Sequence, residues 1–320
     1  MKLSEHPDFE QAILRASEHF RGQGLRPALI EKDYYVTEAL RAIARAAGDK
    51  VIFKGGTSLS KGWNLIQRFS EDIDLFLDPQ AFTPSLGRNA IDRQLKSLRD
   101  AVAKGVPLTF VKEDSKTFGG FGRNDRFSYE QRFGGQGEVA GGVLLESGIA
   151  SGREPTATVA IFSYISQFLR ETNVSLDAED EEPFPMRLLH FRRTFVEKMF
   201  AIHKKVELFK RDAVPVGPHA RHYYDLFQLS GRDEVLAMLR SEEYGQIKAD
   251  YDRISRAYFP EHYFHPNEMS FANSDALFPS QGLSKVLGAQ YELQCKLLCH
   301  GPYPSWTDVM ARFDALRSSL

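Results

Sequence analysis

Two aspartates with one residue between them are the most chemically suggestive feature of this chain of 320 residues. Asp72 and Asp74 stand in the segment Ser70-Glu71-Asp72-Ile73-Asp74-Leu75, whose alternation of acidic and apolar residues predicts a β-strand. Residues i and i+2 of a strand share a face, so both carboxylates are expected to project together while Ile73 and Leu75 enter the core. Like charges held this close repel each other unless a divalent cation lies between them. The pair therefore predicts a metal site.

A glycine-rich segment, Phe53-Lys54-Gly55-Gly56-Thr57-Ser58, precedes the aspartates. It predicts the end of a strand, a two-glycine turn and the start of a helix. Gly55 and Gly56 let the backbone come close to a ligand, and Thr57 and Ser58 offer hydroxyls and amides at a helix N-terminus, where phosphates bind. A phosphate site beside metal-binding carboxylates is the apparatus of phosphoryl or nucleotidyl transfer.

The surrounding pattern predicts an α/β half, residues 1–182, that carries the chemistry, and a helical half, residues 183–320. Predicted strands cover residues 51–54, 72–77, 107–112, 126–132, 142–149 and 156–162. Predicted helices cover 5–23, 27–47, 58–66, 88–104, 187–210, 219–230, 232–240, 243–257, 282–299 and 305–318. The acidic run Asp177–Glu182, followed by two prolines, predicts an exposed linker between the halves. Glycine clusters at 119–122 and 134–137 predict turns.

Composition limits the classes of protein. A hydrophobic content of 42%, with no apolar run of eighteen residues and no charged-then-apolar leader, predicts a soluble cytoplasmic protein with no membrane partner. Cys295 and Cys299 imply no disulfide framework. The net charge of −2 confines any RNA contact to a local patch. Residues 187–221 hold nine Lys or Arg against three acids, and this segment is either a solvated helix face or such a patch.

Further residues have both a structural and a chemical interpretation. Glu146 interrupts an apolar strand, so it either pairs with an arginine or binds a metal. Lys198 lies at the flank of a buried helix face, where it either reaches solvent or meets an anion. Arg221 and Asp225 are four residues apart on a predicted helix and are able to pair. The tyrosines between them, Tyr223 and Tyr224, either stack on a base or belong to the core.

Other signals favour no site. The segment His262–His265 and the residues Cys295, Cys299 and His300 lack a zinc-site spacing. The chain has no G-x-x-x-x-G-K-[ST] loop, which argues against a P-loop NTPase.

The combined pattern GGTSLSK…SEDIDL resembles the signature of the DNA polymerase β-like nucleotidyltransferases, in the branch of the AbiEii/MenT-type toxins of type IV toxin–antitoxin systems. The resemblance covers about residues 30–230. It implies Glu146 as a third metal carboxylate, Lys198 in catalysis or nucleotide binding, and Asp225 as a further functional aspartate with Arg221 as a nucleotide or substrate contact. It also suggests that Lys32 or Asp33, in an EKDY-type segment, lines the site.

The resemblance implies an Mg²⁺-dependent toxin that transfers NMP from an NTP to an acceptor. Asp72, Asp74 and Glu146 would bind one or two Mg²⁺, and the Gly55–Ser58 segment, with Lys61 or Lys198, would hold the triphosphate. The implied acceptor is the 3′ end of tRNA, whose modification would block translation, and the implied partner is an AbiEi-like or similar antitoxin. Three alternatives remain: a protein or small-molecule acceptor, a non-catalytic nucleotide-sensing module, and a nuclease.

Overall fold

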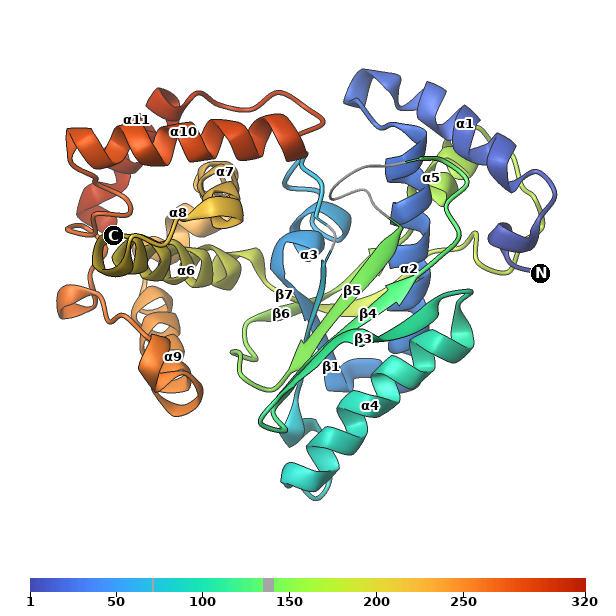
Figure 1. Ribbon diagram of the computed structural model, residues 1–320, viewed down its shortest axis with the longest axis horizontal. Coiled ribbons are helices and arrows are strands. Elements are labelled where there is room, and N and C mark those ends of the chain that lie inside the picture. The colour runs from blue at the N-terminus through green and yellow to red at the C-terminus, as the bar shows by residue number, and fades with distance from the viewer. Residues whose placement is uncertain (71, 135–140) are drawn as a thin grey trace. The chain divides into compact units, whose positions relative to one another are not determined.

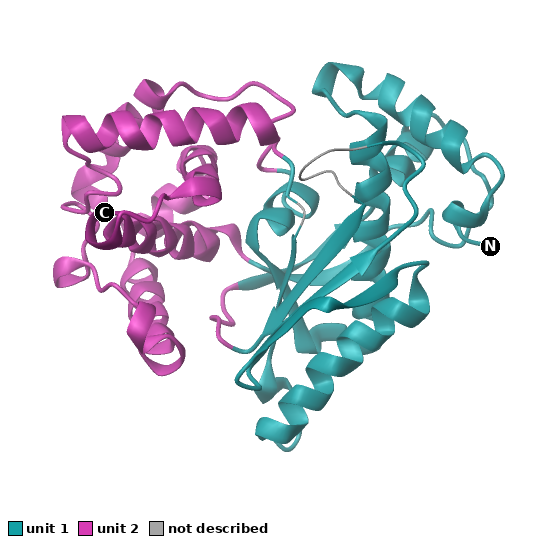
Figure 2. Ribbon diagram, viewed as in Figure 1, with its two compact units in different colours: residues 1–64, 69–149, 156–189 teal, residues 65–68, 150–155, 190–320 magenta. Residues whose placement is uncertain are grey.

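The computed structural model describes residues 1–70, 72–134 and 141–320, and the chain forms two compact units (Figure 2). Unit 1 comprises residues 1–64, 69–149 and 156–189. Unit 2 comprises residues 65–68, 150–155 and 190–320. Neither unit is a continuous stretch of chain. Unit 1 extends past the expected boundary at residue 182, because a further strand joins its sheet after the acidic run.

Unit 1 contains a mixed sheet in which the described strands are ordered β3-β4-β5-β2-β1-β7-β6 (Figure 1). β2 is parallel to β5 and β1 is parallel to β7, while the other neighbours are antiparallel. The strands are β1 (Val51–Lys54), β2 (Asp72–Leu77), β3 (Thr109–Phe118), β4 (Gly122–Ser128), β5 (Gly142–Gly148), β6 (Thr156–Ile161) and β7 (Phe184–Leu189). The mixed α/β prediction is confirmed.

Helices cover one face of this sheet because alternate strand residues are apolar. Ile73, Val143 and Phe127 lie in the core on that face, where α2 (Pro27–Ala47) and α4 (Arg88–Gly105) pack (Figure 1). α1 (Phe9–His19) and α5 (Tyr164–Glu171) pack on α2, and α3 (Gly55–Lys61) contacts β1 and β2. The residues between the buried ones therefore point to the opposite face.

Unit 2 is helical. Its helices are α6 (Phe191–Asp212), α7 (Arg221–Leu229), α8 (Asp233–Leu239), α9 (Glu242–Tyr258), α10 (Gln281–Leu298) and α11 (Trp306–Leu316). α6 contacts α7, α8 and α9, and α7 also contacts α10 and α11. Trp306 packs edge-on against Tyr223, with ring centroids 4.9 Å apart. The C-terminal helices predicted from residue 183 are confirmed from α6 onward, whereas residues 184–189, including the first three of the predicted helix 187–210, form β7. No helix in the described residues is long and apolar enough to cross a membrane.

The acidic run at 177–182 lies within unit 1 and is not a linker between the units, and although Asp177, Glu179 and Glu182 are exposed as expected, Asp180 is not. Asp180 is 2% exposed, and its carboxylate accepts hydrogen bonds from the amide of Leu3 at 2.8 Å and the hydroxyl of Tyr34 at 2.6 Å. Arg41 donates to the carbonyls of Asp180 and Glu182. The prediction was wrong because these partners are more than a hundred residues away in sequence.

The bounds of the helices and strands agree with the predicted ones in some elements and differ in others. β1, β2 and α2 have the predicted bounds, whereas α5 and β7 were not predicted. The turn after β3 is made by Gly119 and Gly120, both with positive φ, so β4 starts at Gly122 rather than at residue 126. The second glycine cluster extends into residues 135–140, outside the described residues. α3 starts at Gly55, so both glycines belong to the helix rather than to a turn before it.

Candidate active site

A row of polar residues crosses four strands on the face opposite α2 and α4. Asn124 of β4 pairs with Glu146 of β5, Glu146 with Asp74 of β2, and Asp74 with Lys54 of β1. Directly paired residues in neighbouring strands point to the same side of a sheet, so these four side chains share a face. Asp72 lies two residues from Asp74 on the same face. The sheet therefore brings the three predicted carboxylates together.

The three carboxylates repel one another. Burial, followed by the negative charges of Asp74 and Asp72, raises the pKa of Glu146 to about 7. Asn124 opposes this by donating a hydrogen bond to Glu146 from its Nδ2 at 2.6 Å. Burial and the neighbouring carboxylates together therefore favour the protonated form of Glu146.

A divalent cation would fit the chemistry of this row, because carboxylate oxygens are the donors that Mg²⁺ prefers. In the described part of the chain, no group of three or more His, Cys, Asp or Glu side chains is already arranged to hold a metal. The observation that favours a cation is the placement of Asp72, Asp74 and Glu146 on one face by strand pairing, where a positive charge would offset the repulsion between the carboxylates. Binding would then draw the oxygens of the three side chains together.

The raised pKa predicts a pH-dependent loss of stability without metal. The folded state binds the Glu146 proton more tightly than the unfolded state, whose carboxyl pKa is about 4.5. The stability that the protonated Glu146 contributes is therefore fully present below about pH 4.5. It is lost as the pH rises through about 7. Glu146→Gln removes this dependence, and in EDTA at pH 8 it is expected to stabilise unit 1 by up to about 3 kcal/mol.

Urea unfolding in EDTA, followed by the fluorescence of Trp63 in a Trp306→Phe background, measures this effect in unit 1 from pH 4 to pH 8. Trp63 reports unit 1 because its indole N–H donates to the carbonyl of Leu189 in the same unit. A stability difference between Glu146→Gln and wild type that stays constant across this range would contradict the prediction.

Gly55 holds the start of α3 against the carboxylate row. Its φ is +75°, and a Cβ there would lie 1.9 Å from Oδ2 of Asp74. Both the backbone conformation and the space therefore require glycine. The close approach expected of this glycine is observed, and the group it approaches is the Asp74 carboxylate. Helix α3 and the acidic row form one local arrangement.

Gly55→Ala is expected to displace Asp74, lower transfer activity by at least about tenfold and cost about 1–3 kcal/mol of stability. Gly48→Ala is the matched control, because Gly48 also has a positive φ, +57°, but nothing within 4 Å of its would-be Cβ. The control variant should lose some stability and keep its activity. Wild-type activity in Gly55→Ala would show that the position of Asp74 does not depend on this glycine.

The predicted hydroxyls bind backbone atoms in this structure. Thr57 Oγ1 donates to the carbonyl of Asp72 at 2.5 Å, and Ser58 Oγ donates to the carbonyl of Gly55 at 2.9 Å. Thr57 is 2% exposed and Ser58 is fully buried. Thr57 thus fixes the first residue of β2 to α3, and the nearby backbone, rather than these hydroxyls, is the part left to meet a phosphate. Gly56, between Gly55 and Thr57, is also buried.

Lys61 forms an ion pair with a residue of the EKDY-type segment. Its Nζ lies 2.6 Å from Oδ1 of Asp33 and 3.1 Å from the carbonyl of Phe162. Asp33 also accepts a hydrogen bond from the amide of Tyr164, so these contacts join α2, α3 and the start of α5. The segment is buried, with Glu31 at 0% and Lys32 at 1% exposure, and is not an exposed helix turn.

The second group of candidate residues lies in unit 2, around Asp225. The Asp225 carboxylate accepts two hydrogen bonds from Arg68, at Nε and Nη2, both 2.7 Å long. Lys198 Nζ lies 2.7 Å from the second carboxylate oxygen and 3.4 Å from Nδ1 of His222. Asp225 is fully buried, and Arg68 and Lys198 are nearly so. Lys198 is therefore neither at the surface nor without a partner.

The charged groups of this cluster shift one another's pKa. Burial alone would raise the pKa of Asp225, but the charges of Arg68 and Lys198 hold it well below its usual value. Burial, with the charge of Lys198, lowers the pKa of His222 to about 3, so its imidazole is neutral at pH 7. Among the described ion pairs, Arg68 and Lys198 thus share the one carboxylate of Asp225. Burial, with the charge of Arg68, also lowers the pKa of Lys198, which an anionic ligand would reverse.

The remaining predictions in unit 2 have separate outcomes. Arg221 is the first residue of α7. The carboxylate of Asp225, which was its expected partner, is bound by Arg68 and Lys198. Tyr223 and Tyr224 are core residues, because they are at most 1% exposed and their hydroxyls bond to the carbonyl of Ala276 and the amide of Gln67. Arg68 was not predicted as a site residue, although it stands four residues before Asp72 in the same motif.

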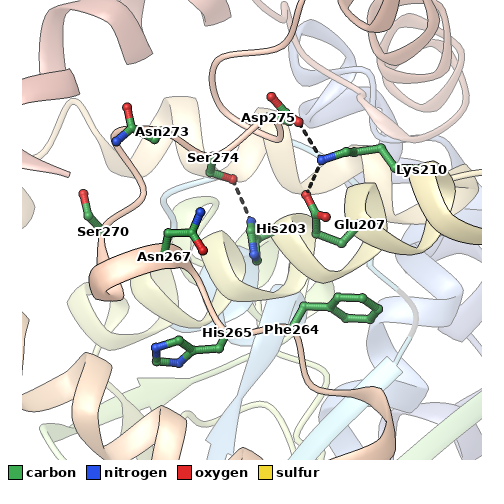
Figure 3. Close-up of a pocket in the computed structure, with 10 residues that line it drawn as sticks. All are labelled: His203, Glu207, Lys210, Phe264, His265, Asn267, Ser270, Asn273, Ser274 and Asp275. Carbon is green, nitrogen blue, oxygen red and sulfur yellow. Dashed lines mark hydrogen bonds and ion pairs between the residues drawn. The ribbon is translucent and has the colours of Figure 1, made fainter.

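A separate polar pocket of about 220 Å³ lies in unit 2 (Figure 3). Its walls come from α6 and the segment 264–275, and its lining includes His203, Glu207, Lys210 and His265. Lys210 bridges Glu207 and Asp275, and His203 contacts Ser274, as Figure 3 shows. The pocket contains none of the predicted site residues, and its two histidines belong to no metal group in the described residues.

Comparison with known proteins gives one family and one fold. The family model described as "Nucleotidyl transferase AbiEii toxin, Type IV TA system" matches residues 38–285, which is well over half of the chain. Among solved structures, the fold is similar to that of MenT4, a nucleotidyltransferase toxin from Mycobacterium tuberculosis H37Rv. The TM-score is 0.56 and the identity 15%, over 96% of this chain and 90% of that one. No curated protein sequence matches the chain.

Proposed function

Since this chain belongs to the AbiEii family of nucleotidyltransferase toxins of type IV toxin–antitoxin systems, we propose that it transfers NMP from an NTP to the 3′ end of tRNA and so blocks translation. The observation that carries the proposal is the acidic row of Asp72, Asp74 and Glu146 on one sheet face, with the start of α3 held against it. An antitoxin, AbiEi-like or similar, is the proposed biological counterpart.

The carboxylates have two tasks in this reaction. Asp72, Asp74 and Glu146 would hold one or two Mg²⁺, which would neutralise charge that develops on the phosphates. The attacking acceptor hydroxyl must lose its proton as its oxygen forms a bond to the α-phosphorus. A carboxylate of the row is suited to accept that proton. The bond between the α-phosphorus and the bridging oxygen then breaks, and pyrophosphate leaves.

Nucleotide binding is proposed to involve the backbone amides of α3 and the positively charged side chain of Lys61. The amides at the start of α3, in Gly55, Gly56, Thr57 and Ser58, are proposed to bind the triphosphate, since helix N-termini favour anions. Lys61 remains a candidate for the same role, although its ammonium is bound by Asp33 here.

Lys198 is proposed to contact a substrate phosphate, because burial lowers the pKa of its ammonium group and an anionic ligand would reverse that shift. An ammonium group has three donors, and Asp225 and His222 occupy two of them among the described contacts. Arg221 is proposed as a further phosphate or substrate contact, and Asp225 as the residue that orients Lys198.

The test incubates the purified protein with Mg²⁺, each labelled NTP separately and total tRNA. Label is expected to enter tRNA with wild type and with Asp114→Ala, but not with Asp72→Ala. Asp114 is the matched control, because it is an exposed aspartate on β3 of the same sheet. Label that enters protein or a small molecule instead would replace the tRNA proposal with another acceptor. NTP binding without any transfer would favour a nucleotide sensor.

A further inference from the structure

Arg126 lies on the same sheet face as the acidic row, and no motif pointed to it. It belongs to β4, two residues from Asn124, and pairs with Leu144 of β5. Leu144 in turn pairs with Asp72 of β2. Arg126 is thus level with Asp72 at a distance of two strands, or about 10 Å between backbones.

The guanidinium of Arg126 has no hydrogen bond or ion pair with any residue that the structure describes. Its backbone amide donates to Ser115 Oγ at 3.0 Å, and its Nη1 lies 3.6 Å from where a Cβ of Gly142 would stand. The guanidinium thus extends across β5 toward Gly142, at an ordinary van der Waals distance from that position. The side chain is partly exposed, so its charge stays accessible from the carboxylate face.

A second arginine of the same strand shows the contrast. Arg123 points to the opposite face, where it is 6% exposed and makes two hydrogen bonds to Asp125, of 3.0 and 2.7 Å. Arg123 is explained by the internal ion pair that it forms. Arg126 has no such explanation, and it stands beside a site whose substrates carry phosphates.

We propose that Arg126 binds a phosphate group of a substrate, and the proposal rests on the nucleotidyl transfer proposed above. A guanidinium presents a planar set of donors that matches phosphate oxygens and keeps its charge at any physiological pH. The phosphate belongs either to the triphosphate of the nucleotide or to the backbone of the RNA acceptor. Both sources have the same chemistry at Arg126.

The experiment measures binding rather than turnover, with two probes: fluorescently labelled tRNA without NTP, and inorganic triphosphate with Mg²⁺. Arg126→Gln is expected to weaken the binding of one probe by about tenfold at low salt, and Arg126→Lys by less. If the tRNA probe is affected, the salt dependence of its log affinity should also fall by about one phosphate contact, a slope change of 0.7–0.9. Weakened triphosphate binding would assign Arg126 to the nucleotide.

Arg93→Gln is the control, because Arg93 is exposed on α4, the helix that covers the opposite face of the sheet. Trp63 fluorescence during unfolding checks that Arg126→Gln remains as stable as wild type. Unchanged binding of both probes by Arg126→Gln, or wild-type protein that binds neither probe, overturns the inference. The labelled-NTP assay tests the proposed transfer separately, so failure of either proposal is recognisable.

Discussion

Asp74→Asn is expected to abolish nucleotidyl transfer and at the same time to stabilise the metal-free protein. The substitution removes a carboxylate from the proposed metal site while keeping its size, and we expect kcat to fall by at least about a thousandfold. It also removes the nearest negative charge from Glu146, whose pKa that charge helps to raise. In EDTA at pH 8, we expect a gain of about 1 kcal/mol in the free energy of unfolding.

The combination distinguishes a functional carboxylate from a structural one, since loss of a structural group lowers activity and stability together. Transfer of label to tRNA measures the first effect, and urea unfolding followed by Trp63 measures the second. Asp114→Asn, on the exposed side of β3, should change neither quantity. An Asp74→Asn protein that is both inactive and less stable than wild type would assign Asp74 to the architecture of the sheet instead.

Asp225→Asn is expected to change stability in the opposite direction from Asp74→Asn: it should cause a large loss of stability that is confined to unit 2. It would leave the guanidinium of Arg68 and the ammonium of Lys198 buried without their shared anion. Breaking a buried ion pair from one side costs about 3–5 kcal/mol, because the remaining charge has lost its solvent and its partner. We expect a loss of this size in the unfolding free energy of unit 2.

The two tryptophans of the chain make this measurement specific, because Trp63 belongs to unit 1 and Trp306 to unit 2. In a Trp63→Phe background, the fluorescence of Trp306 follows unit 2 alone. Lys198→Met is the informative comparison, since it leaves the neutral Arg68–Asp225 pair intact and should cost at most about 1 kcal/mol. Equal destabilisation by Lys198→Met and Asp225→Asn would show that Arg68 alone does not balance the charge of Asp225.

The carboxylate row was predictable because it depends on local periodicity. Alternation in β2 fixed the common face of Asp72 and Asp74, and the single acid of β5 identified Glu146 as their companion once chain order suggested adjacent strands. The family resemblance supplied that order, and strand pairing confirms it. Local signals also gave the bounds of α2, β1 and β2 correctly.

The interactions that were not predicted join residues that are distant in sequence. Arg68 and Asp225 are separated by 157 positions, and nothing local indicates their hydrogen bonds. The acidic run before β7 looked solvated because its composition does not reveal that Asp180 binds Tyr34. α5 had a local signal that was overlooked, the N-cap serine Ser163, whose side chain accepts a hydrogen bond from the amide of Ser166.

The interleaved composition of the two units affects how the protein matures on the ribosome. Unit 2 contains residues 65–68, which emerge early, but Arg68 can form its ion pair only after Asp225 has been synthesised. Unit 1 likewise completes its sheet only when β7 emerges, after residue 189. Both units therefore depend on contacts between segments that are far apart in sequence, and a high proportion of such contacts slows folding. A toxin built in this way becomes competent only when synthesis is well past its midpoint, so truncated chains lack the arrangement that we associate with harm to the host.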